Sequence, residues 1–170
     1  MKKILLLVVL ILGWGLSSCA QKDDFTSTFN FSDPVETAQK AEGILILKVT
    51  SDCQETTTAD GKLKFFFEVE VMDYIKHDLN FYIIKWVVET KVVQSSTASD
   101  LTKQIPKNNY YFIAGKYFSQ TIEDSFYSGA ELGIKLPSNY NPAVSLISQE
   151  ANVLAIFLPY IEAYNSLLAH

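Results

Sequence analysis

The sequence LKFFFEVEVMDYIK, from Leu63 to Lys76, shows the clearest alternation in this chain of 170 residues. One face of an extended chain would carry Leu63, Phe65, Phe67, Val69 and Val71, and the other would carry Lys64, Phe66, Glu68, Glu70 and Met72. A strand with one buried face and one largely wet face is typical of an antiparallel sheet. The segment therefore predicts a long strand in a β-rich domain.

A second alternating segment, from Asn80 to Val93, predicts the partner of this strand. Its apolar face would carry Tyr82, Ile84, Trp86, Val88 and Val92, and its wet face Lys85, Glu89 and Lys91. The buried residues are odd-numbered in the first strand and even-numbered in the second, so the numbers of two opposed residues should sum to an odd number. This favours a four-residue loop at 77–80 or a bulge near Asp73.

The residues before this hairpin predict one helix and one strand. Asp33 and Pro34 are typical of a helix start, and Gly43 of its end. Residues 44–50 form a short apolar run that predicts a strand. Residues 51–61 are polar and predict a loop with a turn at the Asp-Gly pair.

After the hairpin the sequence predicts a short helix, further strands and a final helix. The short helix would be capped by Ser99 or Asp100 and would end before Pro106. A strand over 110–114, or one that continues to Phe118, would follow it. A last strand around 132–136 would lie within a turn-rich segment at 119–141.

The C-terminal segment predicts a helix that starts at Asn141-Pro142. Its apolar face would carry Ile147, Ala151, Leu154, Leu158, Ile161 and Leu168. Pro159 is expected to kink or divide this helix. A strand over 153–158 remains the alternative, because periodicity alone does not classify a short apolar run.

The order of these elements resembles that of a known barrel family. The residues that carry the resemblance are Ala41-Glu42, Lys48-Val49, Phe67 to Val71 followed by Tyr74-Ile75-Lys76, and Asn109 to Ile113. This order is similar to that of the netrin-like, or metalloproteinase-inhibitor-like, oligomer-binding (OB) fold, across residues 33–118. The resemblance implies an α+β, β-rich domain: a small antiparallel OB-like barrel over about 44–136, with an N-terminal helix and a C-terminal helical segment over about 142–168.

The N-terminus resembles the signal of bacterial lipoprotein precursors. Lys2 and Lys3 precede an apolar run over 4–12 that is too short to span a membrane, and Leu-Ser-Ser-Cys ends at Cys19. The resemblance implies a type II signal peptide over 1–18, cleavage between Ser18 and Cys19, acylation of Cys19 and a lipidated tether over 19–32. Such a double anchor would hold the chain on a membrane without any spanning helix. The alternative is an ordinary secretory peptide with an incidental cysteine.

Three charged residues follow the expected lipidation site. Lys22, Asp23 and Asp24 resemble the export signal of Bacteroidetes-type surface lipoproteins, which implies a place on the outer face of the outer membrane. The alternatives are a plain solvated tether and a protein that faces the periplasm.

Charge and composition argue against a nucleic-acid partner. The chain has a formal charge of −5 and contains no arginine. Residues 1–18 carry two of its lysines, so the expected mature chain of 152 residues has a charge of −7. Binding to phosphates requires clustered Lys and Arg, so we expect no nucleic-acid partner.

The sequence offers few groups for catalysis. Its histidines are His77, in the expected hairpin turn, and the last residue, His170; neither is placed as a supported general base. With Cys19 acylated, Cys53 has no partner for a disulfide and is expected to be a structural thiol. None of the common nucleotide, hydrolase or metalloprotease motifs occurs, and no cofactor or metal is expected.

The remaining candidates for function are aromatic side chains. Phe66, Tyr111 and Tyr117 are the aromatics that alternation leaves outside the core, where they would suit contact with a protein, peptide or glycan. They could equally be scattered exposed aromatics without a partner. Two hypotheses follow: a non-catalytic binding module at the cell surface, or an envelope enzyme or its accessory subunit with an unrecognised acidic site.

Overall fold

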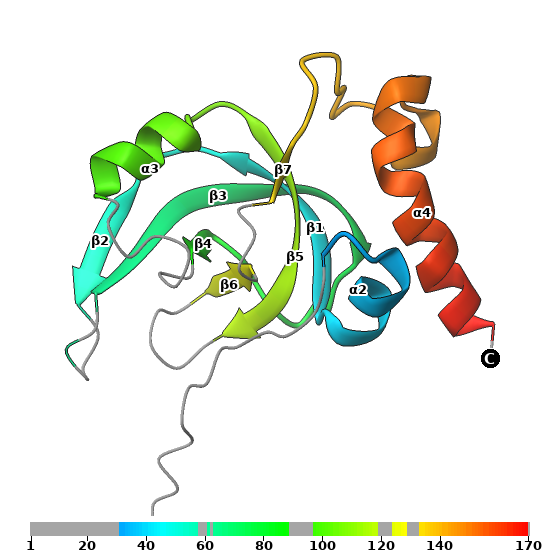
Figure 1. The fold of residues 1–170 in the computed structure, drawn as a ribbon, viewed down its shortest axis with the longest axis horizontal. Helices are drawn as coiled ribbons and strands as arrows, with labels where there is room; N and C mark the ends of the chain where they lie inside the picture. The colour runs from blue at the N-terminus through cyan, green and yellow to red at the C-terminus, as the bar shows by residue number, and fades with distance from the viewer. Residues whose placement is uncertain are drawn as a thin grey trace, which may run out of the picture.

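The computed structural model describes residues 31–57, 61, 63–88, 97–118, 124–128 and 133–169, and within them the domain is β-rich with helices on its outside (Figure 1). Its strands are β1 (Gly43–Val49), β2 (Gln54–Thr57), β3 (Leu63–Lys76), β4 (Lys85–Val88), β5 (Tyr110–Phe118), β6 (Ser125–Ser128) and β7 (Ile134–Lys135). Its helices are α2 (Pro34–Lys40), α3 (Ala98–Gln104), a short 3₁₀ helix (Leu146–Ser148) and α4 (Ala151–Leu168). The α+β class predicted from the sequence is confirmed.

Five of these strands close into an OB-like barrel, as predicted. The order around the barrel is β1, β3, β4, β6 and β5, and β5 pairs again with β1. A closed ring with an odd number of strands cannot be antiparallel at every pairing. Here the exception is β4 with β6, which run parallel, while the other four pairings are antiparallel.

The long strand β3 has the bounds and the faces that its alternation predicts. Phe65, Phe67 and Val69 are buried, while Glu68 and Glu70 are exposed. In the pairing with β4, Phe65 lies opposite Val88 and Phe67 opposite Trp86, so the predicted odd sum is correct.

The connection between β3 and β4 is longer than the predicted four-residue loop. β4 begins at Lys85 rather than Asn80, so its pairing with β3 ends near Glu68, while β3 continues as far as Lys76 along β1, which lies on its other edge. The pairing with β1 shifts register between Ile46 and Leu47 and again between Ile44 and Leu45, on the two sides of the Ile46–Asp73 pair. A register irregularity therefore lies near Asp73, but in the pairing with β1 and not in the pairing with β4 for which the bulge was predicted.

The short helices begin at polar caps. The Asp33 carboxylate accepts from the N–H groups of Val35 and Glu36 at 3.0 and 3.1 Å, as its place before Pro34 predicts. The cap of α3 is Thr97 rather than Ser99 or Asp100. Asp100 completes a capping box by accepting from the Thr97 N–H at 3.2 Å.

The C-terminal helix α4 differs from its prediction in two ways. It begins at Ala151 and not at Asn141, and it runs through Pro159 without a break, so the alternative of a strand is wrong. Pro159 and Ala155, whose carbonyl loses its usual helical partner, are both exposed, so water can bond to that carbonyl.

Apolar side chains pack on both faces of β1. Leu45, Leu47 and Val49 point into the barrel, while Ile44 and Ile46 pack outside it against α4. The face of α4 that meets them carries Val153, Phe157 and Tyr160, rather than the predicted Leu154 and Leu158. In Figure 1, α2 and α4 lie together on one side of the barrel, and α3 lies at the opposite end.

The outer core extends to Phe31, two residues before the predicted domain start. Phe31 is 7% exposed and packs against Phe112 and Tyr160. Its carbonyl accepts from the Tyr160 hydroxyl at 2.7 Å. In the parts of the chain described above, no helix has both the length and the hydropathy of a membrane span.

Candidate functional site

Two of the three aromatic residues proposed for a binding surface are buried. Tyr111 is 2% exposed and Tyr117 is 8% exposed, and both point into the barrel. Their predicted exposure is wrong because β5, like β1, is covered on both faces: Phe112 and Ala114 pack outside it. Alternation alone cannot tell the inner face from the outer one when both are apolar.

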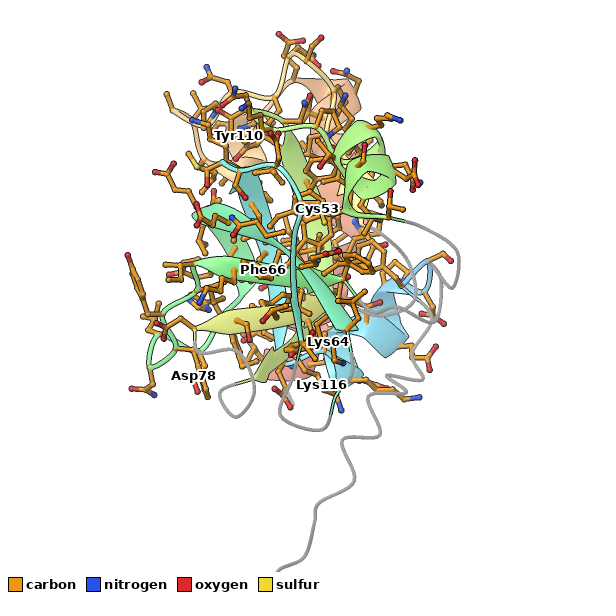
Figure 2. The ribbon with its side chains drawn as sticks, turned by 90° about the vertical axis from the view of Figure 1, so that its left-hand side faces the viewer. Cys53, Lys64, Phe66, Asp78, Tyr110 and Lys116 are labelled. Atoms are coloured by element: carbon orange, nitrogen blue, oxygen red, sulfur yellow. The ribbon has the colours of Figure 1, made fainter. Side chains whose placement is uncertain are left out.

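The third residue, Phe66, lies on the outside of β3 and is half-buried (Figure 2). It packs with Val87 and Tyr127. The Nζ of Lys85 lies 6.0 Å from the ring centre of Phe66, and that of Lys64 lies 5.6 Å from the ring centre of Tyr127. The apolar stems of the two lysines flank this small cluster. It lies on the outer face of the sheet, whereas Tyr111 and Tyr117 lie inside the barrel.

Four exposed large apolar side chains gather instead around the loop between β3 and β4, including the two most exposed among the described residues. Leu79 and Tyr82 are each 75% exposed, Tyr74 is 45% exposed and Phe81 is 41% exposed. Together with His77 we call these residues the hairpin patch. In Figure 2 this loop, marked by Asp78, projects from the edge of the barrel, apart from Phe66.

A series of ring contacts holds the hairpin patch against the barrel. Phe81 stacks on Tyr117 with 4.5 Å between ring centres and 8° between ring planes. The ring of His77 lies 5.7 Å from that of Tyr117 and 5.3 Å from that of Tyr74. Since Tyr117 also packs on Phe126, the patch rests on the barrel core.

Two polar contacts of the Tyr117 hydroxyl indicate which groups around it donate and which accept. The Tyr117 hydroxyl accepts from the Asp78 N–H at 2.9 Å, and it lies 2.6 Å from Nδ1 of His77. Burial raises the pKa of Tyr117, which keeps its proton available for donation to His77. Desolvation lowers the pKa of His77, against the opposing charge of Asp78, so we assign a neutral ring with its proton on Nε2.

This assignment predicts a pH dependence. A histidine whose pKa is lower in the folded than in the unfolded chain contributes stability above about pH 6.5, the unfolded value, and that contribution is lost as the pH falls through the folded value. We therefore expect the wild type to lose more stability than His77→Gln between about pH 7.5 and 5.5. Asp78, Tyr74, Tyr117 and Glu42 face this site, and urea unfolding at each pH measures the difference. Parallel losses in the two proteins would contradict the assignment.

The hairpin patch was missed because the second alternating segment was read as one strand from Asn80. That prediction placed Tyr82 on the buried face. The turn over Asp78-Leu79-Asn80, whose polar ends favour it, was part of the predicted loop at 77–80, but the extension of that loop to residue 84 was not predicted. In the structure the Asp78 carboxylate accepts from the Asn80 N–H at 3.0 Å and from its side-chain amide at 2.8 Å.

A groove of about 300 Å³ adjoins the hairpin patch, with Tyr74 common to both. One wall includes Asp73, Tyr74 and Ile75 of β3, and the other includes Ile147 with Ile161 and Tyr164 of α4. We call it the β3–α4 groove. Ile147 is 71% exposed and forms an apolar part of its rim.

Cys53, expected to be a structural thiol, is half-buried and packs against the barrel core. Its backbone N–H donates to the Thr102 hydroxyl at 2.9 Å, which joins the residue before β2 to α3. Burial is the main cause that raises the pKa of the thiol to about 11, so it stays protonated at neutral pH and is a poor nucleophile.

The other predicted site residues fall outside the described part of the chain. They are Ser18, Cys19, Lys22, Asp23 and Asp24. Within the described ranges, no three or more His, Cys, Asp or Glu side chains come close enough together to hold a metal ion. No protein-family model matches the sequence, and no curated protein matches it either.

Proposed function

We propose that this protein is a non-catalytic binding module, held on the outer membrane by lipids on Cys19, and that the hairpin patch contacts its partner. The observation that carries the proposal is the exposure of Leu79, Phe81 and Tyr82 on one loop. Contiguous exposed apolar side chains on a folded domain mark interaction sites. Tyrosine in particular is enriched in protein interfaces.

The anchoring of the loop supports a binding role. A flexible loop could bury its apolar side chains against its own domain, and it would lose conformational entropy when it bound a partner. Here the stacking of Phe81 on Tyr117 and the bond from the Asp78 N–H hold the loop in place while Leu79 and Tyr82 stay exposed. A preformed apolar surface binds with a smaller entropic cost.

The alternative, an envelope enzyme or its accessory subunit, would need several polar groups that converge in one pocket. The β3–α4 groove holds Asp73, Ser145 and Asn165, but within the described residues no hydrogen bond joins any two of these three side chains into one site. Asp73 accepts from the Tyr74 N–H at 2.8 Å, and Ser145 bonds to Ser148 at 2.9 Å. We therefore favour a binding module, whose partner would be a protein, a peptide or a glycan.

The proposed location rests on the N-terminal sequence. Cleavage after Ser18 would leave Cys19 as the acylated first residue, and Lys22, Asp23 and Asp24 would direct the protein to the outer face of the outer membrane. A protein that faces the periplasm from the same membrane is the alternative. In either position the tether, which ends before the buried Phe31, would let the domain reach a partner a short distance from the bilayer.

The lipid anchor gives the first test. We expect Cys19→Ala to remain unprocessed or to appear in the soluble fraction, because the proposed acyl acceptor is gone. Membrane fractionation and mass spectrometry of the mature N-terminus measure this. Wild-type protein recovered with an unmodified Cys19 would overturn the lipoprotein proposal.

The contact surface gives the second test. A photo-crosslinking phenylalanine analogue in place of Tyr82 in the full-length lipoprotein should give a discrete crosslinked product on intact cells. The same analogue in place of Leu168, which is 67% exposed at the end of α4, is the matched control. Leu79→Ser should reduce the Tyr82 product. Equal crosslinking from both positions, or none from Tyr82, would contradict the proposed use of the hairpin patch.

A further inference from the structure

The β3–α4 groove combines apolar walls with unbalanced negative charge. Ile147 and Ile161 supply aliphatic surface, and the half-buried Asp73 supplies a carboxylate. An apolar side chain could enter such a groove only from another molecule or another part of the chain. A cation beside that side chain would find a partner in Asp73.

Helix α4 adds to the negative potential on the other wall. Its only charged residue is Glu162, and no basic residue lies in its last turn. The C-terminal end of a helix carries a partial negative charge, and no basic residue of α4 itself offsets it. Tyr164 and Asn165, near this end, both line the groove.

The lysine that follows Asp73 on β3 is engaged elsewhere. The Nζ of Lys76 donates to the carbonyl oxygens of Ala38 and Ala41, at 3.1 and 2.6 Å, and so caps the C-terminal end of α2. It also lies 6.0 Å from the ring centre of Tyr164. The Asp73 carboxylate has its bond to the Tyr74 N–H and keeps capacity to accept from an incoming cation.

We propose that the β3–α4 groove binds a segment of a partner protein in which a bulky apolar side chain is flanked by lysine or arginine. The apolar side chain occupies the groove between Ile147 and Ile161, and the cation pairs with Asp73. This inference rests on the proposed function and names the chemistry of its partner, since Tyr74 joins the groove to the hairpin patch. The aliphatic walls favour a protein segment over a glycan, which would need more polar groups.

Labelled nonapeptides test the proposal on the full-length lipidated protein in detergent micelles. The first probe is Gly-Ser-Lys-Phe-Lys-Leu-Lys-Ser-Gly; a second has Glu in place of Lys, and a third has Ser in place of Phe and Leu. We expect the first to bind at least about tenfold more tightly than the others in fluorescence anisotropy. Its affinity should fall as salt rises, because part of the attraction is electrostatic.

Two variants and two matched controls locate the binding. Asp73→Asn should weaken the lysine peptide about threefold, as expected for a partly exposed ion pair, and should not weaken the glutamate peptide, which the Asp73 carboxylate repels. Ile147→Ser should weaken it through loss of an exposed apolar wall. Glu55→Gln on β2 and Ile134→Ser on β7, both exposed and outside the groove, should bind as the wild type does. Thermal melts check that all four variants fold.

Several results would overturn the inference. Equal affinity for the lysine and glutamate peptides would exclude charge recognition by Asp73. Dimerisation of the full chain that Ile147→Ser abolishes would show that a second copy occupies the groove. Failure of the lysine peptide together with site-specific crosslinking from Tyr82 would refute this inference alone, whereas failure of the crosslinking would refute the proposed function.

Discussion

Replacing Trp86 by alanine is expected to lower the free energy of unfolding by about 3–5 kcal/mol, the usual cost of deleting a large buried aromatic. Trp86 is fully buried in the barrel core. Its ring lies 5.9 Å from that of Phe67, which faces it across β3 and β4, and 5.6 Å from that of Tyr111 on β5. The side chain therefore joins opposite walls of the barrel, and alanine would leave a cavity between them.

The control for this prediction is Lys85, the residue before Trp86 on the same strand. Lys85→Ala, on the outer face, should cost less than about 1 kcal/mol, because it removes only a partly exposed cation near Phe66. Glu89, predicted for the same face, lies outside the described residues. Urea unfolding of the full chain measures both variants. If Trp86→Ala unfolds at the wild-type urea concentration, the inner face of β4 has been assigned wrongly.

Trp86→Phe separates packing from hydrogen bonding at the same position. The indole Nε1 is buried and has no hydrogen-bond partner among the residues that the structure describes. Phenylalanine would remove this unpaired donor together with part of the ring volume. We therefore expect a loss clearly smaller than that of Trp86→Ala, with the wild-type fold retained.

The strand pattern predicted the barrel wherever one face of a strand is wet. In β3 the polar residues Lys64, Glu68 and Glu70 marked the outer face, and they also determined the register with β4. In β5 both faces are apolar, so the same reasoning could not distinguish Tyr111, which points inward, from Phe112, which points toward α4. What covers an apolar face depends on distant elements that alternation does not identify.

The missed strands are short and lack a pattern. β6, with the sequence SFYS, is buried at every position, including its two serines. It lies in a segment that turn-forming residues dominate, and four residues are too few to show a period. β2, with the sequence QETT, is an edge strand without an apolar face. Its place beside β3 is set by pairing alone, which a single sequence does not reveal.

The candidate site, too, could be predicted only where local sequence decides the structure. Local chemistry predicted the helix cap at Asp33, and residue order carried the resemblance to lipoproteins at Cys19. To predict the hairpin patch one must know the residue at which β4 begins, and the alternation that continues from Asn80 does not show it. Once Lys85 is the first residue of β4, Phe81 and Tyr82 belong to the loop and not to the core.

Replacing Gly115 by alanine is expected to destabilise the barrel by about 3 kcal/mol or more, at the upper end of the costs of overpacking. Gly115 lies where β5 pairs with β1 on one side and with β6 on the other, opposite Gly43 and Ser128. A Cβ at this position would lie 1.7 Å from the carbonyl oxygen of Tyr127 and 3.0 Å from Cα of Ser128. These are backbone atoms, so a change of side-chain rotamer cannot relieve the clash, and β6 would have to move away from β5.

Gly61→Ala is the matched control for this last variant. Gly61 has a φ of +80°, but a Cβ there would meet nothing within 4 Å. It should therefore cost only the backbone strain of a left-handed residue, about 1–2 kcal/mol. Urea unfolding of both variants separates strain from steric exclusion, and the Gly115→Ala chain should unfold at the lower concentration. If the order is reversed, β5 and β6 approach less closely than the pairing of Gly115 with Ser128 requires, and the barrel owes its closure to other contacts.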